Sequence, residues 1–277
     1  MRHTPIIRRS ALAVALGSVA IAPAIAASPA TAASKKTITL SGSTSVYPLA
    51  NALTKKYARL NKKVRFRVAQ GGSDKGITDA ARGRVTLGMS SRDPRNGDPK
   101  GLNFYRVAKD AVCIITNSAN PVGNLSQQQI ADIFSGKIRS WSEVPGATQT
   151  GTIAIEARNE ASGTLDAFER LFLGDATLSN AAARRASNGL IQAGVKRNPQ
   201  AIGFVSLEFL SGVHTIDVGG VACTTANAKS GRYAGTRNFW LVAKGKPKGE
   251  TARFITWIQK SKAARKIVVA QNQVPLK

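Results

Sequence analysis

Short segments rich in β-branched and apolar residues alternate along this chain with segments of helical periodicity, and this alternation most constrains its fold. Strand composition occurs at residues 37–40, 64–69, 85–89, 107–115, 152–157, 201–205 and 239–243. Helical spacing of apolar residues or helix-start signals occur at residues 48–60, 73–81, 126–134, 162–172 and 253–270. This order predicts an α/β protein in which helices cover a largely parallel sheet.

Four loops of small polar residues each follow an expected strand and precede a helix. They are residues 41–45, 70–73, 90–92 and 161–164. In open α/β sheets, ligands bind beyond the carboxyl ends of the strands, and helix N-termini offer free N–H groups to anions. Each loop alone is explained as a helix cap. Together with Arg158, which could add a forked, charged donor, the four loops indicate an anion-binding site.

The first 32 residues have the features of an export signal. Three arginines precede an apolar run over residues 11–22, and A-x-A cleavage sites end at Ala26 and Ala32. The run is shorter than the roughly 20 residues that span a membrane, so we expect cleavage rather than a retained anchor. Because the first cysteine is Cys113, we expect no lipid anchor and a periplasmic or secreted protein.

Basic residues greatly outnumber acidic ones, with 40 Lys or Arg against 15 Asp or Glu. Cleavage after Ala32 removes three arginines and leaves a net charge of +22. A positive field raises the local concentration of small anions and equally attracts nucleic acid or anionic envelope polymers. A solvated basic surface without a specific partner is the alternative. Charge alone therefore does not identify the ligand.

Common catalytic and metal-binding patterns are missing from the sequence. Gly136-Lys137 and Gly245-Lys246 are not followed by the Ser or Thr of a phosphate loop, and there is no G-x-S-x-G nucleophile motif. His214 is the only histidine beyond the expected signal, and no Cys or His residues have zinc-site spacing. These absences argue against a hydrolase or a metalloenzyme, and we expect a protein that is not an enzyme and uses no metal or cofactor.

Several motifs stand in order along the expected mature chain: TLSGSTS at 39–45, IFSGKI at 133–138, Arg158 before SGT at 162–164, AIGFV at 201–205, and GRY at 231–233 followed by Arg237. As a set they resemble the PstS-like phosphate-binding proteins of ABC transporters. The resemblance implies a class II solute-binding fold, in which two α/β lobes joined by a two-strand hinge close over one anion. It implies a first lobe of residues 35–112 and 207–277 and a second lobe of residues 113–206.

The resemblance also implies which residues bind phosphate. From the first lobe these are Thr44, Ser45 and Ser73, at the N-termini of two helices. From the second lobe they are Arg158, Ser162, Gly163 and Thr164, with Arg158 as the charge partner. The expected protein is a monomer that delivers inorganic phosphate to an ABC-transporter permease.

The loop at residues 90–92 departs from the family pattern. Ser91 stands where many members carry an aspartate that accepts a hydrogen bond from protonated phosphate, and Arg92 would either contact the anion or neutralise the cleft. A carboxylate repels fully deprotonated sulfate, so Ser91 leaves sulfate or another tetrahedral oxyanion as an alternative ligand. Asp74 could replace the missing acceptor, or lie in the first turn of its helix, where the helix dipole favours it.

Two further expectations concern the cysteines and the basic charge. Cys113 and Cys223 are an even pair in an oxidising compartment, which permits a disulfide, although two buried free thiols are the alternative. By the resemblance, both lie near the hinge side of the first lobe. The alternative function is adhesion of a basic secreted protein to anionic envelope polymers, without specific recognition of nucleic acid.

Overall fold

The computed structural model describes Met1 and residues 35–276, so the expected signal peptide, Met1 excepted, lies outside the described residues. Residues 35–276 belong to one compact unit. Among the described residues, no helix has both the length and the apolar character needed to cross a membrane.

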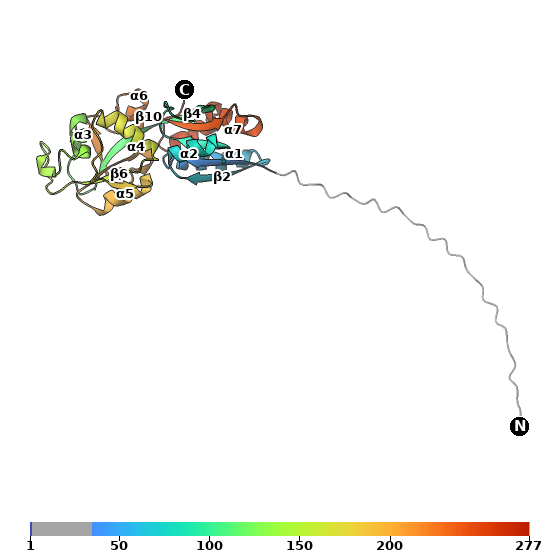
Figure 1. The fold of residues 1–277 in the computed structure, drawn as a ribbon, viewed down its shortest axis with the longest axis horizontal. Coiled ribbons are helices and arrows are strands. Elements are labelled where there is room, and N and C mark those ends of the chain that lie inside the picture. Colours follow the sequence, from blue (N-terminus) through green and yellow to red (C-terminus); the bar gives the residue numbers. More distant parts are fainter. Residues whose placement is uncertain (2–34, 277) are drawn as a thin grey trace. The chain divides into compact units, whose positions relative to one another are not determined.

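Ten strands form one curled sheet (Figure 1). They are β1 (Lys36–Gly42), β2 (Val64–Gln70), β3 (Leu87–Ser90), β4 (Leu102–Thr116), β5 (Asn124–Leu125), β6 (Ala154–Arg158), β7 (Ala183–Arg185), β8 (Ala201–Ser206), β9 (His214–Val218) and β10 (Thr236–Lys244). Along the sheet the order is β2-β1-β3-β10-β4-β8-β6-β7, while β9 pairs with β4 and β5. Strands β1, β2 and β3 are mutually parallel, as are β6, β7 and β8, whereas β10 runs antiparallel to β3 and β4.

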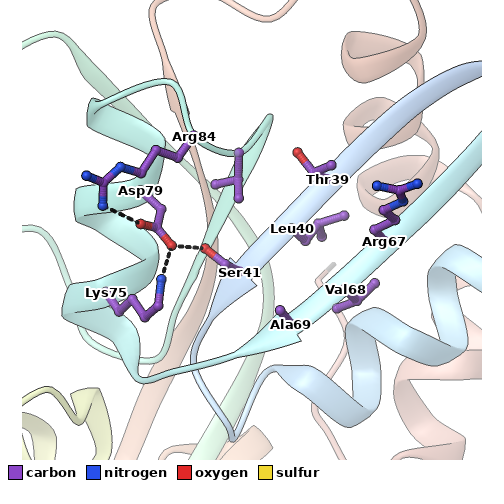
Figure 2. A pocket seen from close by; sticks show the side chains of 10 residues that line it. Thr39, Leu40, Ser41, Arg67, Val68, Ala69, Lys75, Asp79 and Arg84 are labelled. Carbon is purple, nitrogen blue, oxygen red and sulfur yellow. Dashed lines mark hydrogen bonds and ion pairs between the residues drawn. The ribbon is translucent and has the colours of Figure 1, made fainter.

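The helices cover the faces of this sheet. They are α1 (Tyr47–Leu60), α2 (Ser73–Ala81), α3 (Gln127–Ser135), α4 (Gly163–Phe168), α5 (Asn188–Arg197), α6 (Thr225–Ser230), α7 (Gly249–Lys260) and α8 (Lys262–Ala270). Short helical turns lie at η1 (Trp141–Glu143), η2 (Glu169–Leu173) and η3 (Leu207–Phe209). Buried Leu49, Leu53 and Tyr57 explain the helical spacing seen in α1, and Ser41 Oγ ties β1 to α2 by donating to Asp79 at 2.8 Å (Figure 2).

Two main apolar cores divide the molecule. One joins α1, α7 and α8 to β1, β3, β10 and the first half of β4, and contains Leu40, Tyr57 and Phe254. The other lies among α3, α4, β6, β8 and the second half of β4, where Phe168 stacks on Phe204 with ring centroids 4.0 Å apart. We call residues 35–110 and 236–276 the first lobe and residues 111–235 the second lobe; Val274 alone reaches from the first lobe into the second core.

This division differs from the expected one over residues 207–235. Leu207, Ile216, Cys223 and Tyr233 all pack in the second core, and β9 pairs with residues 114–116 of β4. The chain returns to the first lobe only at β10, which pairs with β4 over most of its length. Cys113 and Cys223 are joined by a disulfide with an S–S distance of 2.04 Å, and both pack in the second core, Cys113 on β4 close to the point where that strand passes between the lobes.

The expected α/β class is confirmed, and each expected strand has a counterpart shifted by a few residues at most, apart from the N-terminal extension of β4. The expected helix over residues 162–172 is α4 followed by a π-helical turn, and the helical region at residues 253–270 is broken at Ser261. The Ser261 hydroxyl accepts hydrogen bonds from the backbone of Ala263 and Ala264, so it starts α8 as a new helix. The pattern analysis did not predict β5, β7, α5, β9 or α6.

Candidate functional site

The predicted loops converge where the two lobes meet. The backbone N–H of Asp74, in the first turn of α2, donates to the carbonyl of Ala161 at 3.2 Å. A Cβ atom added to Gly163 would lie 2.3 Å from Ser73 Oγ, so only glycine lets the start of α4 approach α2 this closely. The N-termini of α2 and α4, from opposite lobes, therefore face each other across a narrow space.

Three serine hydroxyls of the first lobe form a connected chain. Ser43 Oγ accepts hydrogen bonds from the backbone of Ser45 and Val46, so its own proton goes to Ser91 Oγ at 2.9 Å. Ser73 Oγ accepts from the backbone N–H of Ser91 at 3.0 Å and lies 3.3 Å from Ser91 Oγ. The proton of Ser91 is therefore left for Ser73 or for a ligand.

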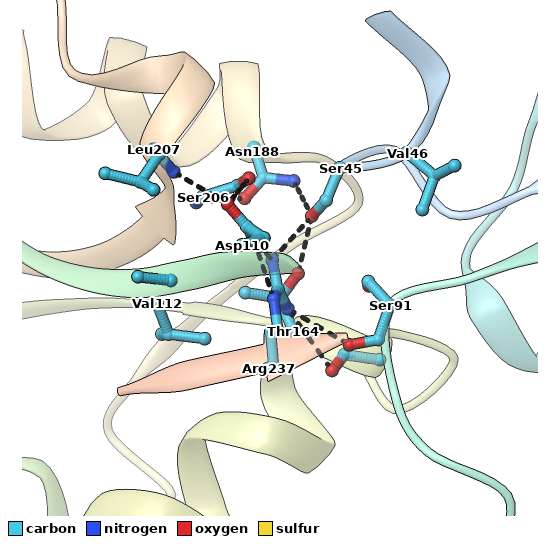
Figure 3. A network of polar contacts seen from close by, with 12 residues as sticks. Ser45, Val46, Ser91, Asp110, Val112, Thr164, Asn188, Ser206, Leu207 and Arg237 are labelled. Carbon is cyan, nitrogen blue, oxygen red and sulfur yellow. Dashed lines mark hydrogen bonds and ion pairs between the residues drawn. The ribbon is translucent and has the colours of Figure 1, made fainter. Parts of the chain in front are cut away.

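A second polar network crosses between the lobes through Ser45 (Figure 3). Ser45 Oγ accepts from Asn188 Nδ2 at 2.9 Å and from Arg237 Nη2 at 3.1 Å. Because a hydroxyl oxygen accepts two hydrogen bonds, its remaining contact, with Thr164 Oγ1 at 2.9 Å, is one in which Ser45 donates. The proton of Thr164 is then free for a ligand. Asn188 Nδ2 also donates to Thr44 Oγ1 at 3.0 Å, which frees the proton of Thr44 in the same way.

Arg158 is a buried cation at the end of β6. Its guanidinium donates to the carbonyls of Arg185 at 3.2 Å and Ala186 at 2.9 Å, and its residue is 1% exposed. No ion pair within residues 35–276 includes it. Burial, and to a smaller extent repulsion from Arg237, lowers the pKa of Arg158 to about 10. A buried charge is costly unless it is paired, so this position is suited to an anionic ligand.

Arg237, on β10, is equally buried but is neutralised within the protein. Its guanidinium lies 2.7 Å from the carboxylate of Asp110, on β4, and Asp110 also accepts from Ser206 Oγ at 2.8 Å. Burial lowers the pKa of Arg237, and the Asp110 carboxylate offsets part of this effect. Arg237 further donates to the carbonyls of Ser91 and Gly163, at 3.4 Å each, so one side chain holds loops from both lobes.

The described residues contain no cluster of three or more His, Cys, Asp or Glu side chains that could hold a metal ion. What the site offers is hydroxyl protons, helix N-termini and one unpaired cation, which together suit a small anion.

A family model described as the PBP superfamily domain matches residues 27–262 of the chain. The chain belongs to the PBP superfamily. Members of this family are substrate-binding proteins and not enzymes, as expected from the sequence.

Similar proteins cover most of this PBP-superfamily chain. The phosphate-binding protein PstS of Bacillus subtilis is 26% identical over 244 residues, which are 86% of this chain and 80% of the relative. A candidate phosphate ABC transporter substrate-binding protein from Clostridium perfringens, solved with bound phosphate, is 32% identical and superposes with a TM-score of 0.83, covering 87% of this chain and 100% of that one. An ABC-type phosphate transport receptor from Vibrio cholerae is 29% identical, with a TM-score of 0.71 over 86% of this chain and 99% of that one.

The structure brings together most of the residues that sequence analysis proposed for the site. Thr44, Ser45, Ser73, Ser91, Ser162, Gly163 and Thr164 are buried at the junction of the lobes, and Arg158 is buried at the end of the strand that leads to it. Ser162 Oγ accepts from the backbone of Thr164 and Leu165, so it caps α4 and keeps its own proton available.

Arg92 is held within a carboxylate network of the first lobe. Its Nε donates to Asp74 at 2.8 Å and its Nη2 to Asp98 at 2.6 Å. Burial opposes its charge, but the hydrogen bonds to Asp98 and Asp74 raise the pKa of Arg92 overall. Of the two roles expected for Arg92, this arrangement favours balancing charge over contacting a ligand. It also engages Asp74, the carboxylate considered as a replacement acceptor.

Sequence analysis assigned no role to Asn188 and Arg237, which donate to Ser45 Oγ, or to Asp110, which pairs with Arg237. A signal for Asp110 was present, because a charged pair interrupts the apolar run of β4, and a buried charge in a strand requires a partner. No comparable local pattern singles out Asn188. It begins α5, a helix that the sequence patterns did not predict, directly after its N-cap Ser187.

Proposed function

We propose that this protein captures inorganic phosphate between its two lobes and delivers it to the permease of an ABC transporter. The observation that carries the proposal is Arg158, a buried cation without an ion-pair partner among residues 35–276, on the strand that leads into the Ser162–Thr164 loop. A phosphate dianion would supply the missing counter-charge. The phosphate-binding relatives from Bacillus and Clostridium support the same ligand.

The donors proposed to bind the anion come from both lobes. Thr44, Ser73 and Ser91 would contribute from the first lobe, while Ser162, Thr164 and the backbone N–H of Gly163 would contribute from the second. Since a ligand held by both lobes favours the arrangement in which they are closed, phosphate would shift the protein toward the closed form. One protein molecule, acting as a monomer, would present that form to the permease.

Titration calorimetry on ligand-stripped protein tests this proposal. Wild type is expected to bind one phosphate, and Arg158→Ala to lose at least tenfold in affinity, since a charge-assisted hydrogen bond contributes about 1.5–3 kcal/mol. Arg197→Ala, which removes an exposed arginine of the second lobe, is the matched control and should bind like wild type. Unchanged phosphate affinity in Arg158→Ala would refute the role of Arg158.

Sulfate remains the alternative ligand because of how the nearby carboxylates are used. Asp110 is paired with Arg237, and Asp74 with Arg92, so neither is a free acceptor for a protonated oxyanion. The hydroxyls of Ser73 and Ser91 can donate or accept, and they would have to discriminate between the two anions. Competition between phosphate and sulfate at pH 6 and pH 8 separates the alternatives: phosphate selectivity at both values supports the phosphate proposal, and equal binding supports a general oxyanion receptor.

A further inference from the structure

The excess positive charge of this protein is concentrated on one lobe. Residues 35–110 and 236–276 contain 26 lysines and arginines and six acidic residues, whereas residues 111–235 contain ten and nine. The second lobe is therefore nearly neutral, and almost the whole net charge of the described chain belongs to the first. Uniform solubilising charge would not produce such a division.

The acidic side chains of the first lobe do not interrupt its positive surface. Each of the six forms an ion pair with a basic side chain: Asp74, Asp79, Asp93, Asp98, Asp110 and Glu250. Many more lysines and arginines remain than these pairs use. The outer surface of the first lobe therefore presents an extended field of one sign.

The densest part of this field lies on packed helices. Helix α1 and the turn after it carry five exposed basic side chains, Lys55, Lys56, Arg59, Lys62 and Lys63. Helix α8 packs against both α1 and α7 and adds exposed Lys262, Arg265 and Lys266. Because neighbouring helices carry these charges, they form a broad basic surface rather than a single basic run.

A second basic feature, a groove of about 440 Å³, lies beside the edge strand β2 on the face of the sheet that α2 covers, opposite the face covered by α1 (Figure 2). Arg67, Lys75 and Arg84 line it, and the Asp79 carboxylate lies among them, bonded to Ser41, Lys75 and Arg84. Three cations against one carboxylate leave the groove positive. Arg67 enters no ion pair among those of residues 35–276.

We propose that the first lobe binds a linear phosphodiester polymer of the cell envelope on this basic surface, independently of the anion site between the lobes. A flexible polymer can follow the helices and enter the groove at β2, which the flat surface of a bilayer cannot do. The exposed large hydrophobic side chains of residues 35–276 are Leu60, Leu190 and Val269, with no aromatic among them. Leu60 and Val269 stand singly on α1 and α8 among the basic side chains, and Trp257 of α7 is half-buried. The surface therefore offers isolated apolar side chains rather than the exposed aromatic rows on which bases stack or the apolar face that inserts into lipid.

The proposed binding would retain the protein in the envelope without consuming its ligand site. The N-terminal sequence predicts export, so the polyanions that the protein would meet are those of the cell envelope. Polymer binding of this kind releases condensed counterions and falls steeply as salt rises. The near-neutral second lobe would then face away from the polymer.

The test compares three exported full-length proteins for binding to purified poly(glycerol phosphate) between 50 and 300 mM salt. One is wild type, one carries Lys55→Gln, Lys56→Gln, Arg59→Gln, Lys62→Gln and Lys63→Gln, and the matched control carries Lys137→Gln, Arg139→Gln, Lys196→Gln, Arg197→Gln and Lys229→Gln. All ten positions are exposed, so the substitutions leave both cores intact. We expect the first-lobe variant to bind the polymer at least tenfold more weakly, and its plot of log affinity against log salt concentration to be shallower by about three units of slope. The control should lose less than threefold in polymer affinity.

Other outcomes would overturn the inference. Equal losses in the two variants would mean that only total charge matters, and tighter binding to phosphatidylglycerol vesicles or to duplex DNA of equal phosphate content would identify a different partner. Free phosphate affinity, measured by calorimetry on the same three proteins, is expected to be unchanged. If the proteins bind phosphate but do not bind the polymer, the polymer inference is wrong and the proposed phosphate function stands. If they do not bind phosphate, the proposed function itself is wrong.

Discussion

Arg158 and Arg237 are both buried near the junction of the lobes, yet only Arg237 has a carboxylate partner. Asp110 lies 2.7 Å from the guanidinium of Arg237, whereas Arg158 contacts two backbone carbonyls. Burial and the charge of Arg237 together lower the pKa of Arg158 to about 10. One of the two charges is therefore compensated within the protein and the other is left for a ligand.

This contrast predicts opposite effects on stability. Arg158→Met removes an uncompensated buried charge and two carbonyl hydrogen bonds, so the ligand-free protein should gain about 1 kcal/mol in free energy of unfolding or lose none. Arg237→Met leaves Asp110 buried without its partner and should cost about 3–5 kcal/mol. Urea denaturation of phosphate-free protein at pH 7 measures both. A loss of more than 2 kcal/mol in Arg158→Met would show that Arg158 stabilises the fold and is not reserved for a ligand.

Asn188 is predicted to orient the hydroxyl of Thr44 toward the anion and that of Ser45 toward Thr164. In Asn188→Asp, the carboxylate can still accept from the backbone of Ser206, as Asn188 Oδ1 does at 3.2 Å, but it cannot donate to either hydroxyl. Both hydroxyls would turn their protons to the carboxylate, and the added negative charge would repel phosphate. We expect phosphate affinity to fall at least tenfold in calorimetry, while Asn180→Asp, at an exposed position, binds like wild type. Equal affinities in the two variants would contradict the orienting role.

The sequence patterns predicted the α/β class and most of the hydroxyl loops because both depend on local signals. Strand composition, helical spacing and the glycine and serine residues that start helices are all encoded within a few residues. The loops at residues 41–45 and 161–164 could therefore be recognised from their own glycine, serine and threonine residues. That these loops from two lobes lie close together depends on the fold. It could be predicted from the sequence only through the resemblance to a known family.

The connections between distant segments could not be read from local patterns. Asp110 and Arg237 pair because β4 and β10 lie side by side, although 126 residues separate them along the chain. Asn188 reaches Thr44 and Ser45 from a helix whose first turn has only an ordinary serine cap. The segment of residues 207–235 packs on the second core through Ile216 and Tyr233, which are scattered apolar residues without a strong period. In each case the determining contact is tertiary.

The disulfide between Cys113 and Cys223 is predicted to stabilise the second lobe. It closes a loop with a sequence separation of 110, so in the chain-entropy account it restricts the unfolded chain by about 4–5 kcal/mol, and measured losses are typically 2–5 kcal/mol. The double variant Cys113→Ser with Cys223→Ser should lose about 2–5 kcal/mol in free energy of unfolding. Wild type in reductant should approach the same urea midpoint, whereas the variant should not respond to reductant. A wild-type midpoint unaffected by full reduction would argue against this stabilisation.

Gly163 is predicted to set how closely the lobes approach. A Cβ at this position would lie 2.3 Å from Ser73 Oγ and 2.9 Å from the backbone nitrogen of Arg92, so Gly163→Ala must separate the starts of α4 and α2. The donors from the two lobes would then no longer converge on one anion, and phosphate affinity should fall at least tenfold.

Gly189→Ala provides the matched control, because Gly189 also lies in the first turn of a helix but its Cβ would have no neighbour nearer than 3.9 Å. This variant should bind phosphate like wild type. Small-angle scattering adds a readout of closure: phosphate should reduce the radius of gyration of wild type and of Gly189→Ala but not that of Gly163→Ala. If Gly163→Ala contracts as wild type does, the contact between α2 and α4 does not limit closure, and the converging donors must be brought together by another part of the junction.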